Sequence, residues 1–347
     1  MPQRAMIPIA GRSIALALAF SLVAASAAHS QPAAEFYKAK QLRLIVGHQV
    51  GNDYDVGARL LAKHLPKHIP GAPTIIVQNM VGAASVAAVN YVYGQAPKDG
   101  TVLGTFSRNI PSQKLMGQAN IEADPRRFNW LGATSYPGRV CTVWHTAPVK
   151  TPDDLFTHEL IVGGAGAGSA PSILPSVFNH VLGTKFRVVE GYKGTQDIVL
   201  AVERGEVQGV CASFGQFRSY DKLISDGKLR FLFQAEETPM PEIASVPSIY
   251  KYATRDEQRQ FMRFVFSSTE FGRPYFLPPE VPADRVALMQ EAVAAAVKDP
   301  ELIAEAEKIR LDMSFRPPAA LQELTAKHYA TQPEVIEAVK KLVPNLQ

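Results

Sequence analysis

The stretch that decides the fold is residues 44–65, LIVGHQVGNDYDVGARLLAKHL. It begins with a short apolar run of the kind that forms a strand. After a turn that contains Gly47 and Gly51, the apolar residues recur at a spacing that places them on one face of a helix: Val56, Leu60, Leu61 and Leu65. This part of the chain therefore predicts a strand, a glycine-bearing turn and a helix.

The composition of this turn indicates backbone N–H groups that are free to meet a partner. Asp55 directly precedes the helical pattern, so we expect it to cap the helix N-terminus. Asn52 and Asp53 are the non-glycine types that best tolerate left-handed backbone angles. Such a turn leaves N–H groups pointing outward at the positive end of a helix.

From residue 41 onward, strand-like and helical segments alternate in two series. The first series is QLRLIVG, a helix over 55–68, TIIVQN, a helix over 85–95, and TVLGTF. The second is ELIVGG, a helix over 171–181, FRVVEGY, a helix over 195–204, EVQGVCASF, a helix over 216–226, and KLRFLFQ. This repetition predicts two α/β units, each a largely parallel sheet flanked by helices.

Two strand-like connectors and a helical tail indicate how the units are joined. The connectors are WLGATSYPGRVCTVWHT and RFVFSSTEFGRPYFLPP, and helices are expected over 284–298, 300–308 and 318–330. Because the tail is too poor in strands to form its own domain, we expect it to return and cover the first lobe. The chain would then cross between lobes twice, forming a hinge with a cleft beside it.

Three further joints resemble the first one: residues 82–85, 163–172 and 191–197. In parallel α/β sheets such joints lie at the carboxyl ends of strands, where ligands bind. Any one of them could be an ordinary turn. Together they indicate several helix N-termini that converge on one cleft and favour an anion, most simply a carboxylate.

The motifs of common enzymes and metal sites are missing from the sequence. It contains no GxxxxGK[ST], no GxSxG and no complete dinucleotide-binding fingerprint. His64 and His68 are four residues apart, but HLPKH lacks the glutamate of a zinc helix, so a solvated helix end is the better interpretation. We find no nucleophile or acid–base pair and therefore expect neither an enzyme, a metal nor a cofactor.

The N-terminus predicts export. Arg4 and Arg12 precede an apolar run over 14–25 and small residues at 28–30, the pattern of a signal peptide over residues 1–30. Without those two arginines, 36 − 2 = 34 basic residues face 32 acidic ones, a formal charge of 34 − 32 = +2. The charges are scattered, which argues against a nucleic-acid partner.

Cys141 and Cys211 could be a disulfide or two buried thiols.

Several segments together resemble the extracytoplasmic solute receptors of tripartite tricarboxylate transporters, called Bug-type receptors. The resemblance covers essentially the whole chain after the leader, and its most specific segments are residues 44–65, IIVQNMVGAASVAAVNYVYGQAPKDGTVLGTF, GTKFRVVEGYKGTQDIVLAVERGEVQG and PPEVPADRVALMQEA. It implies a two-lobed, type II-like periplasmic binding protein, with lobe 1 over 31–140, lobe 2 over 141–267, and a segment over 268–347 that returns to lobe 1.

The resemblance also implies a function. Such a receptor is a monomer in the periplasm, closes about its hinge on a small organic acid, and delivers that acid to membrane permease subunits. Two other functions remain open: a receptor that passes its ligand to a membrane sensor kinase, and an exported α/β enzyme. The resemblance favours a disulfide between Cys141 and Cys211.

The resemblance implies ligand-binding loops at 51–55, 83–85, 105–108, 165–169 and 192–197. The residues expected at the site are Gly51, Asn52, Asp53, Tyr54, Asp55, Ala83, Ala84, Ser85, Thr105, Ser107, Arg108, Ala165, Gly166, Gly168, Ser169, Tyr192, Gly194, Thr195 and Asp197. Arg108 could supply paired hydrogen bonds to an acid or lie on the surface.

The first loop departs from this family, which keeps glycines where this chain has Asn52 and Asp53. Two carboxylates about 4 Å apart at an effective dielectric constant near 20 repel by roughly 4 kcal/mol, whereas a helix N-terminus returns only about 0.3–1 kcal/mol. We therefore expect that Asp53 turns to solvent, or that the ligand carries a cationic or hydrogen-donating group, or that it is not a simple dicarboxylate.

Overall fold

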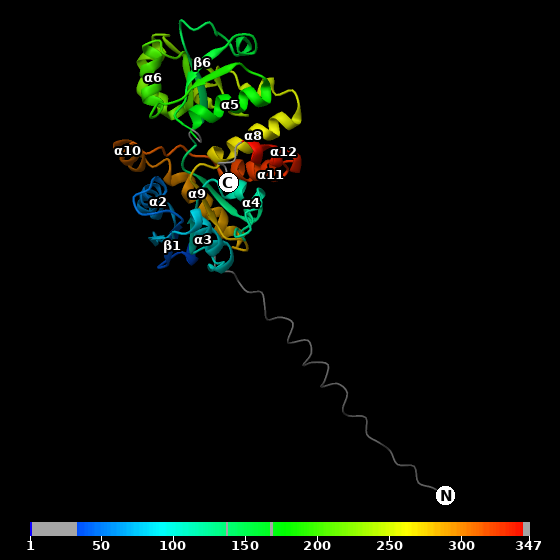
Figure 1. Ribbon diagram of the computed structural model, residues 1–347. Helices are drawn as coiled ribbons and strands as arrows, with labels where there is room; N and C mark the ends of the chain where they lie inside the picture. The colour runs from blue at the N-terminus through cyan, green and yellow to red at the C-terminus, as the bar shows by residue number, and fades with distance from the viewer. Residues whose placement is uncertain (2–32, 137, 167–168, 343–347) are drawn as a thin grey trace.

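The computed structural model describes residue 1 and residues 33–136, 138–166 and 169–342. It has two lobes, one above the other in Figure 1, and each is built around a five-stranded sheet. The predicted signal peptide lies outside the described residues. Within the described part of the chain, no helix is long and apolar enough to cross a membrane.

The first sheet has the strand order β2-β1-β3-β10-β4. Its strands are β1 (Gln41–Val46), β2 (Thr74–Asn79), β3 (Val102–Thr105), β4 (Asn129–Ala133) and β10 (Pro274–Leu277). β1 is parallel to β2 and β3, and β10 is antiparallel to both β3 and β4. The sheet is therefore largely parallel, as the sequence predicts, and its one reversed strand comes from far along the chain.

The second sheet repeats this plan in the order β7-β6-β8-β5-β9. Its strands are β5 (Arg139–Trp144), β6 (Leu160–Gly163), β7 (Phe186–Val189), β8 (Gly209–Ser213) and β9 (Leu229–Gln234). β6 is parallel to β7 and β8, while β5 is antiparallel to β8 and β9. In each sheet the reversed strand is the one that the chain reaches on crossing from the other lobe, so the two predicted crossings lead into β5 and β10.

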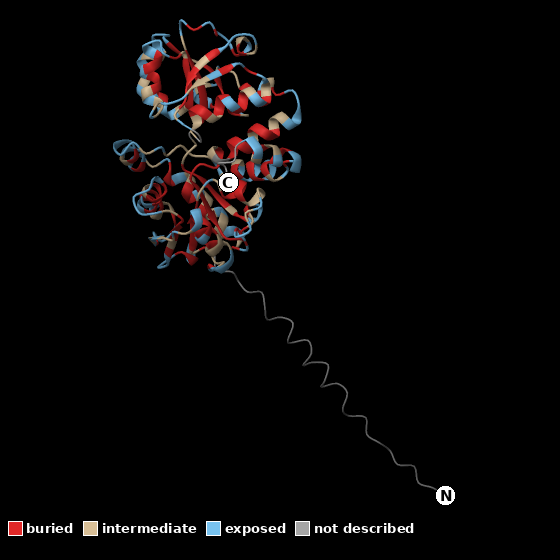
Figure 2. Ribbon diagram, viewed as in Figure 1, coloured by how far each residue is buried: buried red, intermediate tan, exposed pale blue. Residues whose placement is uncertain are grey.

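Both sheets are buried on both faces. In β1, Leu44 packs in one apolar cluster and its neighbour Ile45 in another, because successive side chains point to opposite faces of a sheet. The helices that cover the sheets include α2 (Asp53–His64), α3 (Val86–Asn90), α5 (Ala170–Leu182), α6 (Thr195–Glu203), α9 (Ala283–Ala296) and α11 (Pro318–Tyr329), and α10 (Pro300–Lys308) packs on α2. Figure 2 shows buried residues along the strands and exposed residues on the outer helices.

The structure corrects two expectations for the second half of the chain. The apolar run RFVFSSTEF is not a strand: it belongs to helix α8 (Asp256–Phe271), whose Phe261, Phe264 and Val265 pack in a core cluster of the second sheet. The last helix, α12 (Pro333–Leu342), also packs its apolar face in that cluster instead of covering the first lobe. α8, α11 and α12 lie together at the junction of the lobes (Figure 1).

The two crossing segments are held together by Gly272 and Arg273. Gly272 has a φ of +58°, and a Cβ atom added to it would lie 1.6 Å from the carbonyl oxygen of Ser135 on the other crossing segment. The buried guanidinium of Arg273 donates to the carbonyl oxygens of Thr134, Asp53 and Asp312. The hinge therefore depends on backbone contact at one residue and on one cation at the next.

A buried network of charges lies beside the hinge. The Arg139 backbone N–H and Nε donate to Glu236 Oε1 over 2.9 and 3.2 Å, and Tyr136 donates to Glu236 Oε2 over 2.5 Å. Glu270 accepts a hydrogen bond from Arg316 at 3.2 Å and lies 3.8 Å from an Arg139 nitrogen. Burial, followed by repulsion from Glu236, raises the pKa of Glu270 to about 7.

The disulfide that the sequence left open is present. Cys141 and Cys211 are opposite each other on β5 and β8, with their Cα atoms 4.0 Å apart, and both are buried. The bond links residues 70 positions apart.

We expect this disulfide to contribute strongly to stability. Closing a loop of this size lowers the entropy of the unfolded chain, which stabilises the fold by about 4 kcal/mol in the chain-entropy model. The double variant Cys141→Ala/Cys211→Ala should therefore lose about 2–4 kcal/mol of unfolding free energy, measured by urea denaturation. A reducing agent should destabilise the wild type and leave the variant unchanged. Equal urea midpoints for the two proteins would contradict this expectation.

Candidate ligand-binding site

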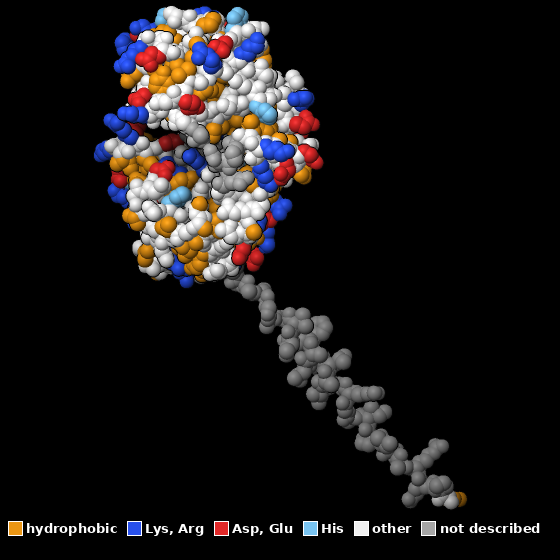
Figure 3. All heavy atoms as spheres, in the orientation of Figure 1, with side chains coloured by type: hydrophobic (Ala, Val, Ile, Leu, Met, Phe, Trp, Pro, Cys, Tyr) orange, Lys and Arg blue, Asp and Glu red, His pale blue; other side chains and the backbone are white. Residues whose placement is uncertain are grey.

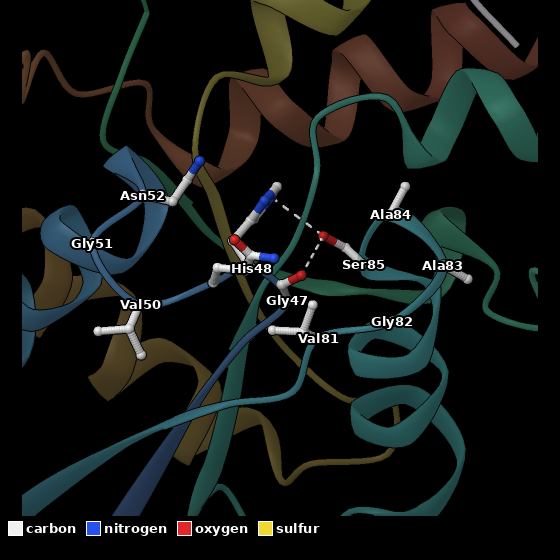
Figure 4. Close-up of a pocket in the computed structure, with 11 residues that line it drawn as sticks. Gly47, His48, Val50, Gly51, Asn52, Val81, Gly82, Ala83, Ala84 and Ser85 are labelled. Carbon is white, nitrogen blue, oxygen red and sulfur yellow. Dashed lines mark hydrogen bonds between the residues drawn. The ribbon is translucent and has the colours of Figure 1, made fainter.

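The turns that follow β1 and β2 line a cavity of about 500 Å³ on the first lobe (Figure 4). Five predicted site residues line it: Gly51, Asn52, Ala83, Ala84 and Ser85. The other lining residues are Gly47, His48, Gln49, Val50, Val81 and Gly82. None of these lining side chains is acidic, which favours an anionic ligand.

His48 and Ser85 form the polar centre of this cavity. The Ser85 hydroxyl donates to the Gly47 carbonyl oxygen over 3.0 Å and lies 3.3 Å from His48 Nε2 (Figure 4). Since Ser85 gives its only proton to Gly47, His48 Nε2 must carry the hydrogen in their contact. Burial lowers the pKa of His48 below its ordinary value; the nearby Asp53 opposes this shift and Arg108 reinforces it, so the neutral form of the ring is favoured.

The turn that carries Ser85 is strained. Ala83, Ala84 and Ser85 have φ angles of 44°, 52° and 82°, and three successive non-glycine residues in the left-handed region are unusual. Strain of this kind costs of order 1–3 kcal/mol per residue and collects at ligand clamps. Gly47 makes the close approach of this turn possible, because a Cβ at Gly47 would lie 2.6 Å from the Ser85 side chain.

The helix that follows the first turn is capped by Asn52 and not by Asp55, so the expected cap is wrong. The Asn52 side chain accepts from the Tyr54 N–H over 2.9 Å, and α2 begins at Asp53. Asp55 is only 1% exposed and accepts hydrogen bonds from Gly51 N–H, Arg59 and Asn79. Burial opposes its ionisation, but these hydrogen bonds hold the pKa of Asp55 below its ordinary value. Asp55 therefore holds the turn in place through hydrogen bonds from a buried position.

Asp53 is exposed but its charge is balanced. The side chain is 60% exposed and its carboxylate lies 3.8 Å from the buried Arg273 guanidinium at the hinge. Asp53 is not among the residues that line the cavity. Its pairing with Arg273 reduces the repulsion that the sequence predicts between this carboxylate and an acid ligand.

Two more predicted residues support the site from beneath. Tyr54 is buried, stacks on His48 with ring centroids 4.0 Å apart, and donates to the Gly272 carbonyl oxygen. Its oxygen accepts the backbone N–H of Arg108 over 3.2 Å. Thr105 ends β3 and is 1% exposed. Of the third predicted loop, Ser107 is half-buried and the Arg108 side chain is exposed.

On the second lobe, the loop after β6 is already occupied by a carboxylate. Glu190 Oε2 accepts the Gly166 N–H over 2.9 Å and the Ser172 hydroxyl over 3.0 Å. Ala165 and Ser169 are half-buried beside this contact. The predicted Gly168 lies outside the described residues.

A second cavity, of about 570 Å³, is formed mainly by the loops after β7 and β8. The predicted Gly194, Thr195 and Asp197 line it, and Thr195 donates to Gln216 over 2.6 Å. Tyr192 is not a lining residue, and its hydroxyl donates to Glu206. Arg310, which follows α10 on the returning segment, completes this cavity. The surface is hollowed between the lobes, on the side where α6 and α10 face each other (Figure 3).

Sequence reasoning missed three residues of this region: His48, Glu190 and Arg310. His48 follows Gly47 directly in the stretch that decided the fold, so its place in the turn was a usable signal. Glu190 and Arg310 gave no such signal. Glu190 meets a loop 24 positions away, and Arg310 lies more than ninety positions from the loops it faces.

His64, Asp299 and Glu301 form a group that could hold a cation in the part of the chain that the structure describes. The Lys67 ammonium already lies among them, 2.6 Å from Glu301 and 3.3 Å from His64 Nδ1. This arrangement joins α2 to α10 through an ordinary charge network.

Comparisons with known proteins agree with this architecture. No family model matches the chain. A curated Cupriavidus necator protein, described as the UPF0065 protein in the gbd 5′ region, is 26% identical over 248 residues, which span 70% of this chain and 72% of that protein.

The chain is also similar to solved structures of solute-binding proteins. A TctC solute-binding protein from Polaromonas, solved without ligand, gives a TM-score of 0.63 at 18% identity and covers 88% of this chain and 98% of its own. The periplasmic binding protein BugD gives a TM-score of 0.46 at 17% identity, covering 87% and 97%. The similarity to the Polaromonas structure shows that the fold is that of a two-lobed periplasmic binding protein. This similarity to a TctC solute-binding protein confirms the resemblance that the sequence motifs indicate.

Proposed function

We propose that this chain is a periplasmic solute receptor that captures a small organic acid between its lobes and delivers it to the permease subunits of a tripartite tricarboxylate-type transporter. The observation that carries the proposal is the cavity around His48 and Ser85, which has hydrogen-bond donors and no acidic lining residue. A ligand carboxylate placed there would meet the N-terminal end of α2, where negative charge is favoured.

The contact between Ser85 and His48 favours binding over catalysis. A nucleophilic serine must give its proton to a base as it attacks. Here the Ser85 proton goes to the Gly47 carbonyl oxygen, and His48 acts as a donor. The geometry therefore suits a pair that orients a ligand.

The first experiment is a thermal-shift screen of the mature protein against a panel of mono-, di- and tricarboxylic acids, together with native mass spectrometry for a retained small molecule. A ligand at a hundred times its Kd should stabilise the fold by about 2.7 kcal/mol. The absence of both a shift and a retained molecule would overturn the proposal. Cross-linking to the permease subunits tests delivery separately.

Gly47→Ala is expected to abolish most of the binding. The new methyl group would collide with Ser85 and push the strained turn away from β1, so affinity for the ligand found in the screen should fall at least tenfold, about 1.4 kcal/mol. Isothermal titration calorimetry measures this change. Gly94→Ala is the matched control, because no atom lies within 4 Å of the added Cβ. Equal affinities for the two variants would contradict the assignment of this cavity.

A further inference from the structure

Glu190 lies in a cradle that a ligand carboxylate would also fit. Its Oε2 accepts a backbone N–H from Gly166 and a hydroxyl from Ser172 in the first turn of α5, and Ser169 donates to that same hydroxyl. Gly164 leaves the space open, because a Cβ there would lie 2.5 Å from Oε2. A carboxylate of the same lobe thereby lies beside the first turn of the 13-residue helix α5, held by the Gly166 N–H and the Ser172 hydroxyl.

This arrangement makes the two lobes electrostatically different. The cavity on the first lobe has no acidic lining residue. On the second lobe, the exposed carboxylate of Glu190 follows β7 directly, and the cavity formed by the next residues of that loop holds Asp197 beside Lys193 and Arg310. A ligand anion that approached α5 would therefore meet a like charge where the bare helix end would attract it.

We infer that Glu190 is a specificity-determining residue, a built-in carboxylate that reserves the α5 end of the cleft for a hydrogen-donating group of the ligand. If the function proposed above holds, the ligand is an acid that places one carboxylate on the first lobe and a hydroxyl, amide or ammonium group on the second. A second carboxylate at the α5 end is disfavoured.

The test uses three probes of matched length: succinate, succinamate and 4-aminobutyrate. Their Kd values are measured by calorimetry on the mature wild type, Glu190→Gln and Glu190→Ala. The wild type should bind succinamate or 4-aminobutyrate at least tenfold more tightly than succinate. Both variants should lose that preference, because Glu190→Gln removes the charge and Glu190→Ala also empties the cradle. The glutarate series repeats the comparison one methylene longer.

Glu159→Gln is the control, since Glu159 is an exposed carboxylate of the same lobe that pairs with Arg187 and lies outside both cavities. It should keep the wild-type preference. A purely structural role for Glu190 would weaken all probes alike, so the ratio of Kd values is the diagnostic quantity. Wild-type binding of succinate at least as tight as that of the other probes, or an unchanged ratio in Glu190→Gln, would overturn the inference alone. If no variant binds any acid, the proposed function fails, and this inference fails with it.

Discussion

Gly272→Ala is expected to destabilise the protein by about 4 kcal/mol or more, among the largest effects of a single substitution. The added Cβ would lie 1.6 Å from the Ser135 carbonyl oxygen, a backbone atom that no side-chain rotation can move away. The φ of 58° and ψ of −133° at this residue also belong to a region that alanine rarely adopts. The two crossing segments would have to separate, and the contacts of Arg273 would be lost with them.

Urea denaturation of the purified variant measures this effect. Two other glycines separate its causes: Gly183 has a φ of +78° with no atom near the added Cβ, and Gly94 has open space without that φ. We expect a loss of about 1 kcal/mol for Gly183→Ala and a change within about 0.5 kcal/mol for Gly94→Ala. If Gly272→Ala is no less stable than Gly183→Ala, backbone contact at the hinge does not decide its stability. If Gly272→Ala fails to fold while the other two variants fold, the role of this backbone contact in stability is supported.

Arg139→Met should cost about 3–5 kcal/mol, since removing one partner of a buried ion pair leaves the other charge uncompensated. Arg139 is 3% exposed, and its guanidinium lies between Glu236 and Glu270 while donating to the Phe266 carbonyl oxygen. The matched control is Arg187→Met. Its pair with Glu159 is half-exposed and should contribute at most about 1 kcal/mol. Similar losses in the two variants would contradict the assigned role of the buried network.

The loss in Arg139→Met should depend on pH in a defined direction. Because the folded-state pKa of Glu270 is raised from 4.5 to about 7, the folded state holds a proton that the unfolded chain releases between these values. The contribution of Glu270 to stability is therefore present below about pH 4.5 and is lost as the pH rises through 7. Without Arg139 the Glu270 carboxylate is harder to ionise. The difference in urea midpoint between wild type and variant should therefore be larger at pH 8 than at pH 5.

The sequence could predict the elements of both lobes where the pattern was local. Strands β1, β2 and β3 and helix α2 follow from alternating apolar and helical spacing, which depends only on neighbouring residues. The run RFVFSSTEF at 263–271 shows the limit of this reasoning. Its Phe and Val residues suit a strand, but packing against the second-lobe core makes it part of α8. Likewise, Asn52 and Asp55 were both competent caps, and contacts of Asp55 with Asn79 and Arg59 decided between them.

For the proposed site, the sequence by itself predicted the turns that line the first-lobe cavity, because glycine and small polar residues after a strand are a local signal for exposed N–H groups. Only the tertiary structure decided which charges meet there. Arg273 reaches Asp53 across 220 positions, Glu190 fills the loop after β6, and Arg310 closes a cavity of the other lobe. Charges act through space and not along the chain, so the electrostatic character of the cleft exists only once both crossings have brought these residues together.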